Sequence, residues 1–252
     1  MKKLKSLFSE VKELLRSVPS IVVASFFLSL VGMNLLANKS IDLGLDWLAL
    51  DAGILFSWVS FLSMDMIVRR FGLKAANILS IVGLLFNLFL ALIFFLASLL
   101  PGTWGESYVA EGVSETINAA LNGTFRGTWY VLMGSSVAFL ASALVNNFSN
   151  FLLGKVFKGG GRASFYARSY ISTFVGQFVD NLIFALIVSL HFFGWSLLQC
   201  FMCALTGAVA ELLCEILFSP FAYRLVKKWE KEEVGKAYLD KYVIKSLPEA
   251  AK

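Results

Sequence analysis

Six stretches of mostly apolar residues, each close to the ~20 residues that carry a helix across a bilayer, divide this sequence. They lie at about 20–37, 52–68, 75–99, 129–153, 167–193 and 195–222. Only 15% of the residues are charged, whereas a soluble domain has roughly a quarter. These features exclude a soluble enzyme with a single core. They predict an all-α, polytopic membrane protein with six transmembrane helices.

The Lys and Arg residues determine the orientation of the six predicted spans. With these boundaries, 20 of the 22 lie in the N-terminal segment, two loops and the C-terminal tail, which all fall on one side of the membrane. Only Lys39 and Arg126 lie on the other side. Because cytoplasmic loops carry the excess of basic residues, both termini are predicted to be cytoplasmic, with the protein in the plasma or inner membrane.

This topology divides the chain into an amphipathic helix on the cytoplasmic face (1–19), a transmembrane domain (20–222) and a basic cytoplasmic tail (223–252). The first segment has apolar side chains at helical spacing opposite a basic face, which suits a helix on the inner leaflet; a partner helix is the alternative. In the longest connector, SETINAALN predicts a short surface helix. Topology and lipid attraction account for the basic surplus, so no nucleic-acid partner is expected.

The fifth predicted span has a polar face. At about 100° per residue, its polar and small side chains fall within about 100° of one another, and Phe184 follows one turn later. These side chains are Ser169, Thr173, Gly176, Gln177 and Asp180. The pattern is typical of a solute pocket between helices. Close helix packing without a ligand is the alternative, and it explains Ser169 and Thr173 better than Gln177 and Asp180.

Other spans also contain polar residues, which are costly in a bilayer unless they face a cavity or a partner. They are Asn34 and Asn38 at the end of the first span, Asp65 in the second, Asn146, Asn147 and Asn150 at the end of the fourth, and Glu211 and Glu215 one turn apart in the sixth. Asp65 has the alternative of pairing with Arg69, four residues further on. The two glutamates have the alternative of pairing with a base such as Arg168. These residues are therefore candidates both for a binding site and for internal pairing.

Motifs for nucleotide, metal and cofactor chemistry are missing from the sequence. Neither G-x-x-x-x-G-K-[ST] nor H-E-x-x-H occurs, so a P-loop ATPase and a zinc protease are not expected. Cys200 and Cys203 have C-x-x-C spacing, but no His lies near them, and with Cys214 they are expected to be buried thiols. We therefore expect no metal, no cofactor, no catalytic residue and no enzymatic activity.

Four stretches of the chain resemble one family of membrane proteins. They are NLLANKS at 34–40, DAGILFSWVSFLSMDMIVRRFGLKAANILSIVGLLFNL at 51–88, RSYISTFVGQFVDNLIFAL at 168–186 and FSPFAYRLVKKWE at 218–230. The polar pattern of the fifth span is the most specific part. On these residues the chain resembles the vitamin uptake transporter family, whose best-known members are called queuosine precursor transporters.

The resemblance implies six helices and import of a small planar solute, a 7-deazapurine precursor of the tRNA nucleoside queuosine, without a fused ATPase. It also implies a fold similar to the substrate-binding subunits of energy-coupling-factor vitamin transporters. The chain departs from the family pattern at Arg69, where many members have Glu, and at Glu211, where a basic residue is expected. Import of another vitamin-like solute and docking on a separate energising ATPase complex are alternatives, and the oligomeric state is left open.

The resemblance makes the transmembrane domain a transport domain with a substrate site among its polar residues. The candidates are Asp180, Gln177, Thr173, Ser169, Phe184, Asn38, Asn147 and Asp65. In this interpretation Asp180 accepts two adjacent N–H donors of a deazapurine, Gln177 or an Asn meets its carbonyl, and Phe184 stacks on its ring.

Energy for uptake must come from outside the chain, because the sequence has no nucleotide site. Uptake then runs downhill, with an ion, or on the ATPase of a partner. For a proton, Glu211 is the expected carrier because it lies deeper than Glu215, the second candidate. The alternative is that Glu211 pairs with a base and that substrate enters downhill and is trapped by metabolism.

Overall fold

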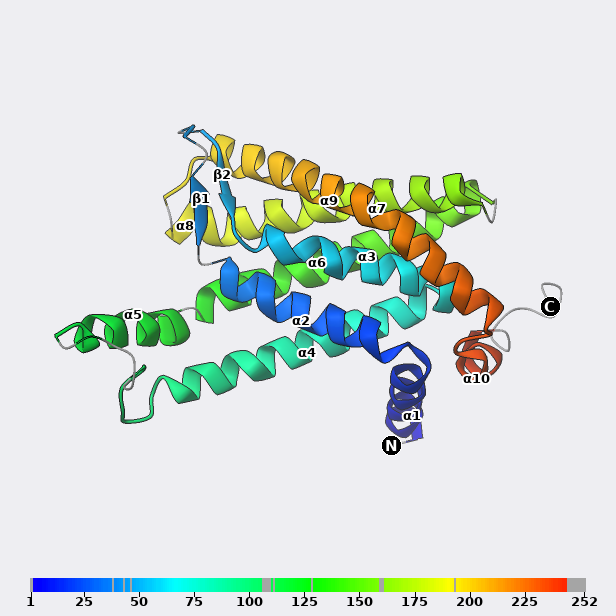
Figure 1. The fold of residues 1–252 in the computed structure, drawn as a ribbon, viewed down its shortest axis with the longest axis horizontal. Coiled ribbons are helices and arrows are strands. Elements are labelled where there is room, and N and C mark those ends of the chain that lie inside the picture. The colour runs from blue at the N-terminus through cyan, green and yellow to red at the C-terminus, as the bar shows by residue number, and fades with distance from the viewer. Residues whose placement is uncertain are drawn as a thin grey trace.

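The computed structural model describes residues 2–37, 39–42, 44–45, 47–105, 110, 112–127, 129–158, 161–192 and 194–243. The described chain is a helical membrane protein with one short β-ribbon (Figure 1). Its elements are α1 (Lys2–Ser17), α2 (Ser20–Leu36), β1 (Ser40–Asp42), β2 (Ala49–Asp51), α3 (Ile54–Phe71), α4 (Leu73–Ala97), α5 (Ser114–Gly127), α6 (Trp129–Val156), α7 (Arg162–Phe184), the π-helix η1 (Ala185–Ser189), α8 (Leu190–Phe192), α9 (Leu197–Lys231), α10 (Lys236–Tyr238) and the π-helix η2 (Leu239–Val243).

Each of the six apolar stretches contains a long helix, and α5 covers the SETINAALN stretch of the connector. The expectation of an all-α chain misses the antiparallel ribbon of β1 and β2, in which Ile41 pairs with Leu50. Strands of three residues are too short to produce a recognisable alternation in the sequence. The ribbon lies at the end of the bundle that is remote from both termini (Figure 1).

Four stretches are long and apolar enough to cross a membrane: Leu73–Ala97, Ser114–Val156, Arg162–Ser189 and Leu197–Lys231. The second of these contains α5 and α6 and also residue 128, which lies outside the described residues. The number rises to five if α1 and α2, which are bent by 106° at their junction, count as one span. The helix α3 is less apolar because its 18 residues include Asp65, Arg69 and Arg70. The prediction of six spans therefore exceeds what length and apolarity alone support.

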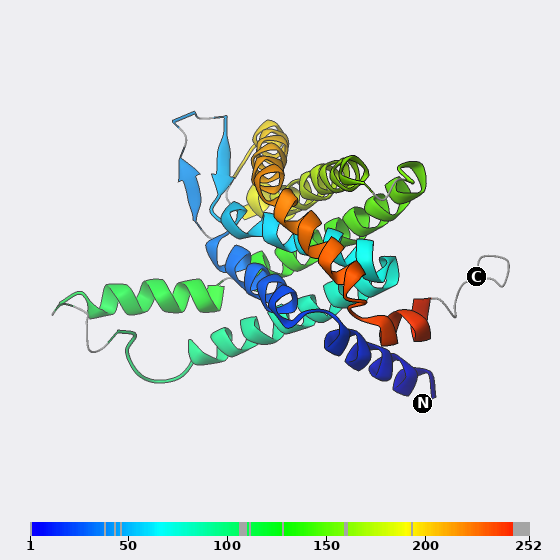
Figure 2. The same cartoon turned by 45° about the vertical axis from the view of Figure 1, so that its right-hand side comes forward.

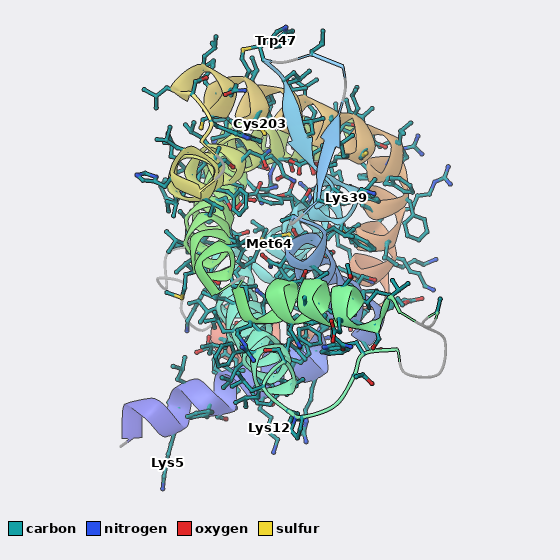
Figure 3. All side chains as sticks on the ribbon, turned by 90° about the vertical axis from the view of Figure 1, so that its left-hand side faces the viewer. Lys5, Lys12, Lys39, Trp47, Met64 and Cys203 are labelled. Carbon is teal, nitrogen blue, oxygen red and sulfur yellow. The ribbon has the colours of Figure 1, made fainter. Side chains whose placement is uncertain are left out.

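The helix α3 is the most enclosed element of the bundle, with 11 of its 18 residues buried. Figure 1 shows α3 and α6 between α2 and α4 on one side and α7 and α9 on the other, and α3 contacts all five of these helices. Met64 lies inside the bundle with no exposed surface (Figure 3). Because neighbouring helices rather than lipid surround α3, it can hold polar side chains that an outer helix could not.

The outer helices present apolar side chains to their surroundings. On α4, Leu85 and Phe89 are exposed, and on α9, Leu217 and Phe221 are exposed. In water such a surface would be an aggregation site, whereas in a bilayer it matches the hydrocarbon. The distribution of exposed residues therefore agrees with a membrane protein.

Both terminal segments pack at the same end of the bundle (Figure 2). Glu10 of α1 forms an ion pair with Lys74 of α4, with 2.6 Å between Oε1 and Nζ, and accepts a hydrogen bond from the Tyr238 hydroxyl. Burial, followed by the charge of Glu10, raises the pKa of Tyr238 above its usual range, so the phenol stays neutral. On α1, Leu14 packs inside the protein while Phe8 stays exposed, so its apolar face is divided between protein and surroundings.

Candidate functional site

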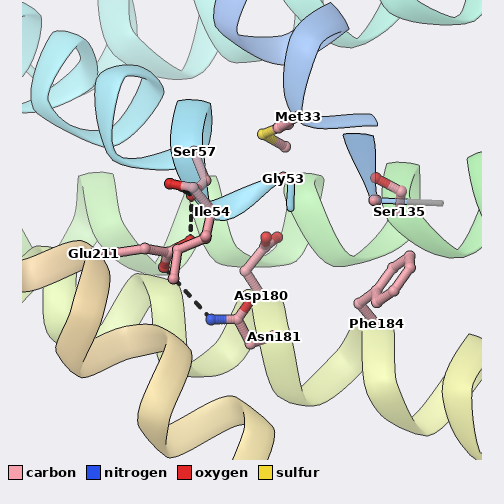
Figure 4. A pocket seen from close by; sticks show the side chains of 10 residues that line it. Met33, Gly53, Ile54, Ser57, Ser135, Asp180, Asn181, Phe184 and Glu211 are labelled. Carbon is pink, nitrogen blue, oxygen red and sulfur yellow. Dashed lines mark hydrogen bonds between the residues drawn. The ribbon is translucent and has the colours of Figure 1, made fainter. Parts of the chain in front are cut away.

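A small cavity lies where α7 meets α2, α3, α6 and α9. Its volume is about 30 Å³, which is room for one or two water molecules. Its polar lining consists of Ser57 from α3, Ser135 from α6, Asp180 and Asn181 from α7, and Glu211 from α9 (Figure 4). Phe184, one turn after Asp180, supplies an aromatic wall, and Met33 and Ile54 supply apolar ones. This combination is typical of a site that orients a small, partly polar molecule.

Glu211 joins three helices at this cavity. Its Oε1 accepts a hydrogen bond from the Ser57 hydroxyl, and its Oε2 accepts one from the Asn181 amide at 3.4 Å (Figure 4). Only 2% of the residue is exposed. The glutamate that sequence reasoning assigned to proton coupling is therefore part of the cavity wall.

Asp180 lies in the same wall and is held by a neighbouring helix. The Ser142 hydroxyl of α6 donates a hydrogen bond to Asp180 Oδ1 at 2.7 Å. Asp180 and Glu211 line the same cavity, so two of its polar groups are acids, whose oxygens accept hydrogen bonds. It is complementary to a molecule that presents several N–H groups or a positive charge.

The approach of α9 to α7 at the cavity depends on a glycine. A Cβ built on Gly207 would stand 2.6 Å from Asn181 Nδ2, which is closer than a real contact allows. Gly207 lies one turn before Glu211 on α9, so the absent side chain leaves room for the amide that reaches Glu211. Sequence periodicity assigned no role to either Gly207 or Asn181.

A second polar region lies along α7 on the side of Ser169, where Asp65 of α3 is enclosed. Asp65 is 1% exposed and accepts hydrogen bonds from Ser169 at 2.6 Å and from the Asn146 amide at 2.9 Å. Ser172 and Thr173 approach the same carboxyl at 3.2 to 3.4 Å. The alternative pairing of Asp65 with Arg69 is wrong, because the carboxyl is taken up by these donors and the guanidinium lies over the Phe165 ring.

Glu215 of α9 belongs to this second region. The Ser169 hydroxyl contacts Glu215 Oε1, and the residue has no exposed surface. The alternative pairing of Glu215 with Arg168 is also wrong. The guanidinium donates instead to the Asn150 backbone oxygen at 3.3 Å and to its side-chain oxygen at 2.8 Å.

Gln177 lies between the two regions on α7, one turn after Thr173 and one turn before Asn181. It is fully buried, and neither its Oε1 nor its Nε2 has a hydrogen-bond partner among the described residues. Leaving a buried amide unpaired costs about 1–3 kcal/mol per group. A polar ligand that reached Gln177 could hydrogen-bond to its amide and remove that penalty.

The polar face of the fifth span is thus divided into two regions. Asp180 and Phe184 line the cavity, while Ser169 and Thr173 contact Asp65. Asn147 lies elsewhere: its amide donates to Asn77 Oδ1 at 2.9 Å and to Ser80 Oγ at 3.4 Å, which joins α6 to α4. Asn38 lies outside the described residues.

Sequence reasoning missed Ser57, Ser135 and Asn181 at the cavity. A signal for Ser135 exists on α6, where Ser135, Ser142 and Asn146 fall within about 40° of one another at about 100° per residue. This polar face of the fourth span meets that of the fifth, as the Ser142–Asp180 and Asn146–Asp65 hydrogen bonds show. Comparing polar faces between spans would have predicted that α6 and α7 share a site.

Residues 51–225 match the protein family described as "Putative vitamin uptake transporter". The matched range runs from the end of β2 to α9 and contains the polar residues of both regions. Neither a curated protein nor a solved structure matches the chain. The matched range covers more than half of the chain, and the chain therefore belongs to the vitamin uptake transporter family.

Proposed function

We propose that this protein imports a small planar nitrogen heterocycle, specifically a 7-deazapurine precursor of queuosine, across the plasma membrane. Membership of the vitamin uptake transporter family supports import of a small solute. The observation that carries the choice of solute is the cavity in which Asp180, Asn181 and Glu211 stand beside Phe184. This lining offers acceptors for the N–H groups of a deazapurine edge and one aromatic side chain for its ring.

In the proposed complex Asp180 accepts two adjacent N–H donors of the base in a bidentate arrangement. The Asn181 amide, which replaces Gln177 in this role, donates to the carbonyl of the base. Phe184 stacks on the ring face. Another vitamin-like solute would need the same combination of adjacent N–H donors and a flat ring.

The cavity of about 30 Å³ is too small for a bicyclic base, since pockets for small molecules measure about 300–1,000 Å³. Binding therefore requires α7 to move away from α3 and α9. Such a movement is what alternating access to a site within the membrane demands. In this proposal the structure represents a closed state between two open ones.

The proposed topology has six spans, α2, α3, α4, α6, α7 and α9, with both termini in the cytoplasm. The basic residues support it, because the segments rich in Lys and Arg are the two termini and the α3–α4 and α6–α7 connections. The helix α3 is included in spite of its charges because the other five helices surround it. The energy source is a gradient or metabolic trapping of the product.

The test is uptake of labelled 7-deazapurine bases by cells that cannot make them and that express either the wild type or a variant. Asp180→Asn replaces one acceptor oxygen by a donor and should lower affinity by about ten- to hundredfold, or about 1–3 kcal/mol. Asp240→Asn, the same change at an exposed residue after α9, is the matched control and should transport normally.

Three results would contradict the proposal or part of it. Normal uptake by Asp180→Asn at wild-type expression would move the binding site away from the cavity. If the wild type takes up no deazapurine but takes up another flat heterocycle, the substrate is that heterocycle and the deazapurine assignment is wrong. An ATPase subunit that co-purifies with the protein and is required for uptake would replace gradient-driven import with docking on an energising complex.

A further inference from the structure

Asp65 of α3 and Glu215 of α9 meet at a single hydroxyl group. Ser169 Oγ lies 2.6 Å from Asp65 Oδ2 and also within hydrogen-bond distance of Glu215 Oε1. Both acids are buried, with 1% and 0% of their surface exposed. The three residues come from three different helices, so the contact exists only in the packed bundle.

The contacts of Ser169 with both acids require one more hydrogen than a serine hydroxyl and two carboxylates contain. A hydroxyl group has one hydrogen and can donate it to one acceptor. If Ser169 donates to Asp65, its contact with Glu215 becomes a hydrogen bond only when Glu215 has a proton to donate to Ser169 Oγ. Two ionised carboxylates would leave one of the two contacts as a repulsive approach of oxygen to oxygen.

The other neighbours of the two acids identify Glu215 as the protonated one. Asp65 accepts from the amide of Asn146 as well as from Ser169, and two such donors suit a carboxylate, whereas Thr173 lies near both acids. Glu215 Oε2, in contrast, is buried and has no hydrogen-bond partner within the part of the chain that the structure describes. An unpartnered oxygen is tolerated far better as the carbonyl of a neutral acid than as half of a buried carboxylate.

The other charged and titratable groups near Asp65 and Glu215 are bound to other partners, so none of them replaces the proton on Glu215. On α7, Arg168 is bound to Asn150 and Tyr170 shares a hydrogen bond with Ser219; on α3, Arg69 lies over the Phe165 ring. On α9, Glu211 accepts a hydrogen bond from Ser57, and Cys214 immediately precedes Glu215 in the sequence. On α6, the residues that face the pair are the neutral amides Asn146 and Asn150. In the described part of the chain no Lys or Arg forms an ion pair with Asp65 or Glu215.

We propose that Asp65, Ser169 and Glu215 form a proton-binding site that holds one exchangeable proton, on Glu215 in the closed state. The site lies one helical turn from the cavity on α9, where Glu211 and Glu215 are four residues apart, and it shares α7 with Asp180. A movement of α7 that opens the cavity also separates Ser169 from one of the acids. Gain or loss of the proton is thereby linked to opening.

The proton can be tested without any substrate. Infrared difference spectra of the purified full-length protein in lipid nanodiscs, recorded between neutral and alkaline pH, should contain the carbonyl stretch of a buried carboxylic acid, and deuterium oxide should shift it. Glu215→Gln should remove this band, because the amide donates to Ser169 in place of the acid and keeps the shape. Glu230→Gln, the same change at a partly exposed, ion-paired position on α9, should leave the band intact.

Asp65→Asn provides a second variant with a different expected result. It removes the carboxylate that Ser169 and its neighbours stabilise, so the proton affinity of Glu215 should change and the band should persist at a shifted frequency. A wild-type protein without the band at neutral pH, or a band that survives Glu215→Gln, would overturn the proposal. Thermal stabilisation by sodium chloride but not by choline chloride, without the band, would make the site a cation site instead.

The link between this proton and uptake rests on the proposed function and is tested separately in liposomes. With a proton gradient, the wild type should accumulate the labelled base, while Glu215→Gln should exchange it across the membrane without accumulation. Accumulation by Glu215→Gln would overturn the coupling even if the infrared band is present. If neither protein binds the base while the band behaves as expected, the substrate assignment fails and the proton site stands.

Discussion

Gly207 of α9 and Asn181 of α7 lie so close together that a Cβ at position 207 would be 2.6 Å from the Asn181 amide nitrogen. The clash would be with the end of a side chain that can rotate, and not with backbone. A methyl group at this position should therefore turn the amide away from Glu211 and leave the helices in place. The contact makes Gly207 a probe of the cavity that does not alter any polar residue.

We expect Gly207→Ala to weaken uptake of the substrate about fivefold, since loss of one hydrogen bond of about 1 kcal/mol has this effect. Concentration-dependent uptake at matched expression would measure the change. Gly123→Ala on α5 is the control, because a Cβ there meets nothing within 4 Å. Equal uptake by both variants would show that Asn181 has no part in binding.

Gly176→Ala should instead reduce stability. A Cβ at position 176 would be 2.7 Å from a ring carbon of Phe61 and 2.8 Å from the Asn146 Cβ, and neither neighbour can move away freely. Overpacking of this kind costs about 1–3 kcal/mol. The melting temperature of the detergent-solubilised protein should fall for Gly176→Ala and stay unchanged for Gly123→Ala. An unchanged melting temperature for both would mean that α7 packs more loosely against Phe61 and Asn146 than these distances indicate.

The proposed topology predicts opposite labelling of two exposed glutamates. A cysteine in place of Glu115 on α5 should react with a membrane-impermeant thiol reagent added to intact cells, whereas one in place of Glu233 after α9 should react only after the cells are opened. The native cysteines are buried or partly buried and should contribute little background. Labelling of position 115 only in opened cells would mean that the proposed orientation or the proposed number of spans is wrong.

Arg70 should hold the segment after α9 against α3 and so protect that segment from proteolysis. The guanidinium of Arg70 donates two hydrogen bonds, at 3.0 and 2.8 Å, to the backbone oxygen of Val234, which ties this segment to α3. Arg70→Ala should make the chain beyond residue 231 more susceptible to limited proteolysis. Arg224→Ala removes an exposed arginine from α9 and should leave the cleavage rate unchanged. Equal cleavage rates for the two variants would contradict this role of Arg70.

The positions of the helices could be predicted from the sequence because a long apolar stretch has few alternatives to a helix in a bilayer. The polar face of the fifth span could be recognised for a similar reason, since Ser169 and Asp180 repeat with the helical period. The periodicity of one helix, however, shows which residues share a face and does not show what that face meets. The division of α7 between the cavity and Asp65 required the structure.

The Asp65–Glu215 site was beyond sequence reasoning for the same reason. Asp65 and Glu215 lie in different spans, with 149 intervening residues between them. Only the packing of α3 and α9 against α7 brings both to Ser169. The ribbon of β1 and β2 was missed because strands this short have no periodicity that a sequence reveals.

The enclosure of α3 also has a consequence for how the protein is made. A helix with an acid at its centre and serines along its length partitions poorly from the insertion machinery into lipid, because each central charge costs about 2.5–3.5 kcal/mol. The more apolar α4, whose 25 residues begin directly after Gly72, partitions readily. During synthesis α3 is therefore expected to wait at the insertion site until α4 has emerged, so that the two enter the bilayer together as a helical hairpin.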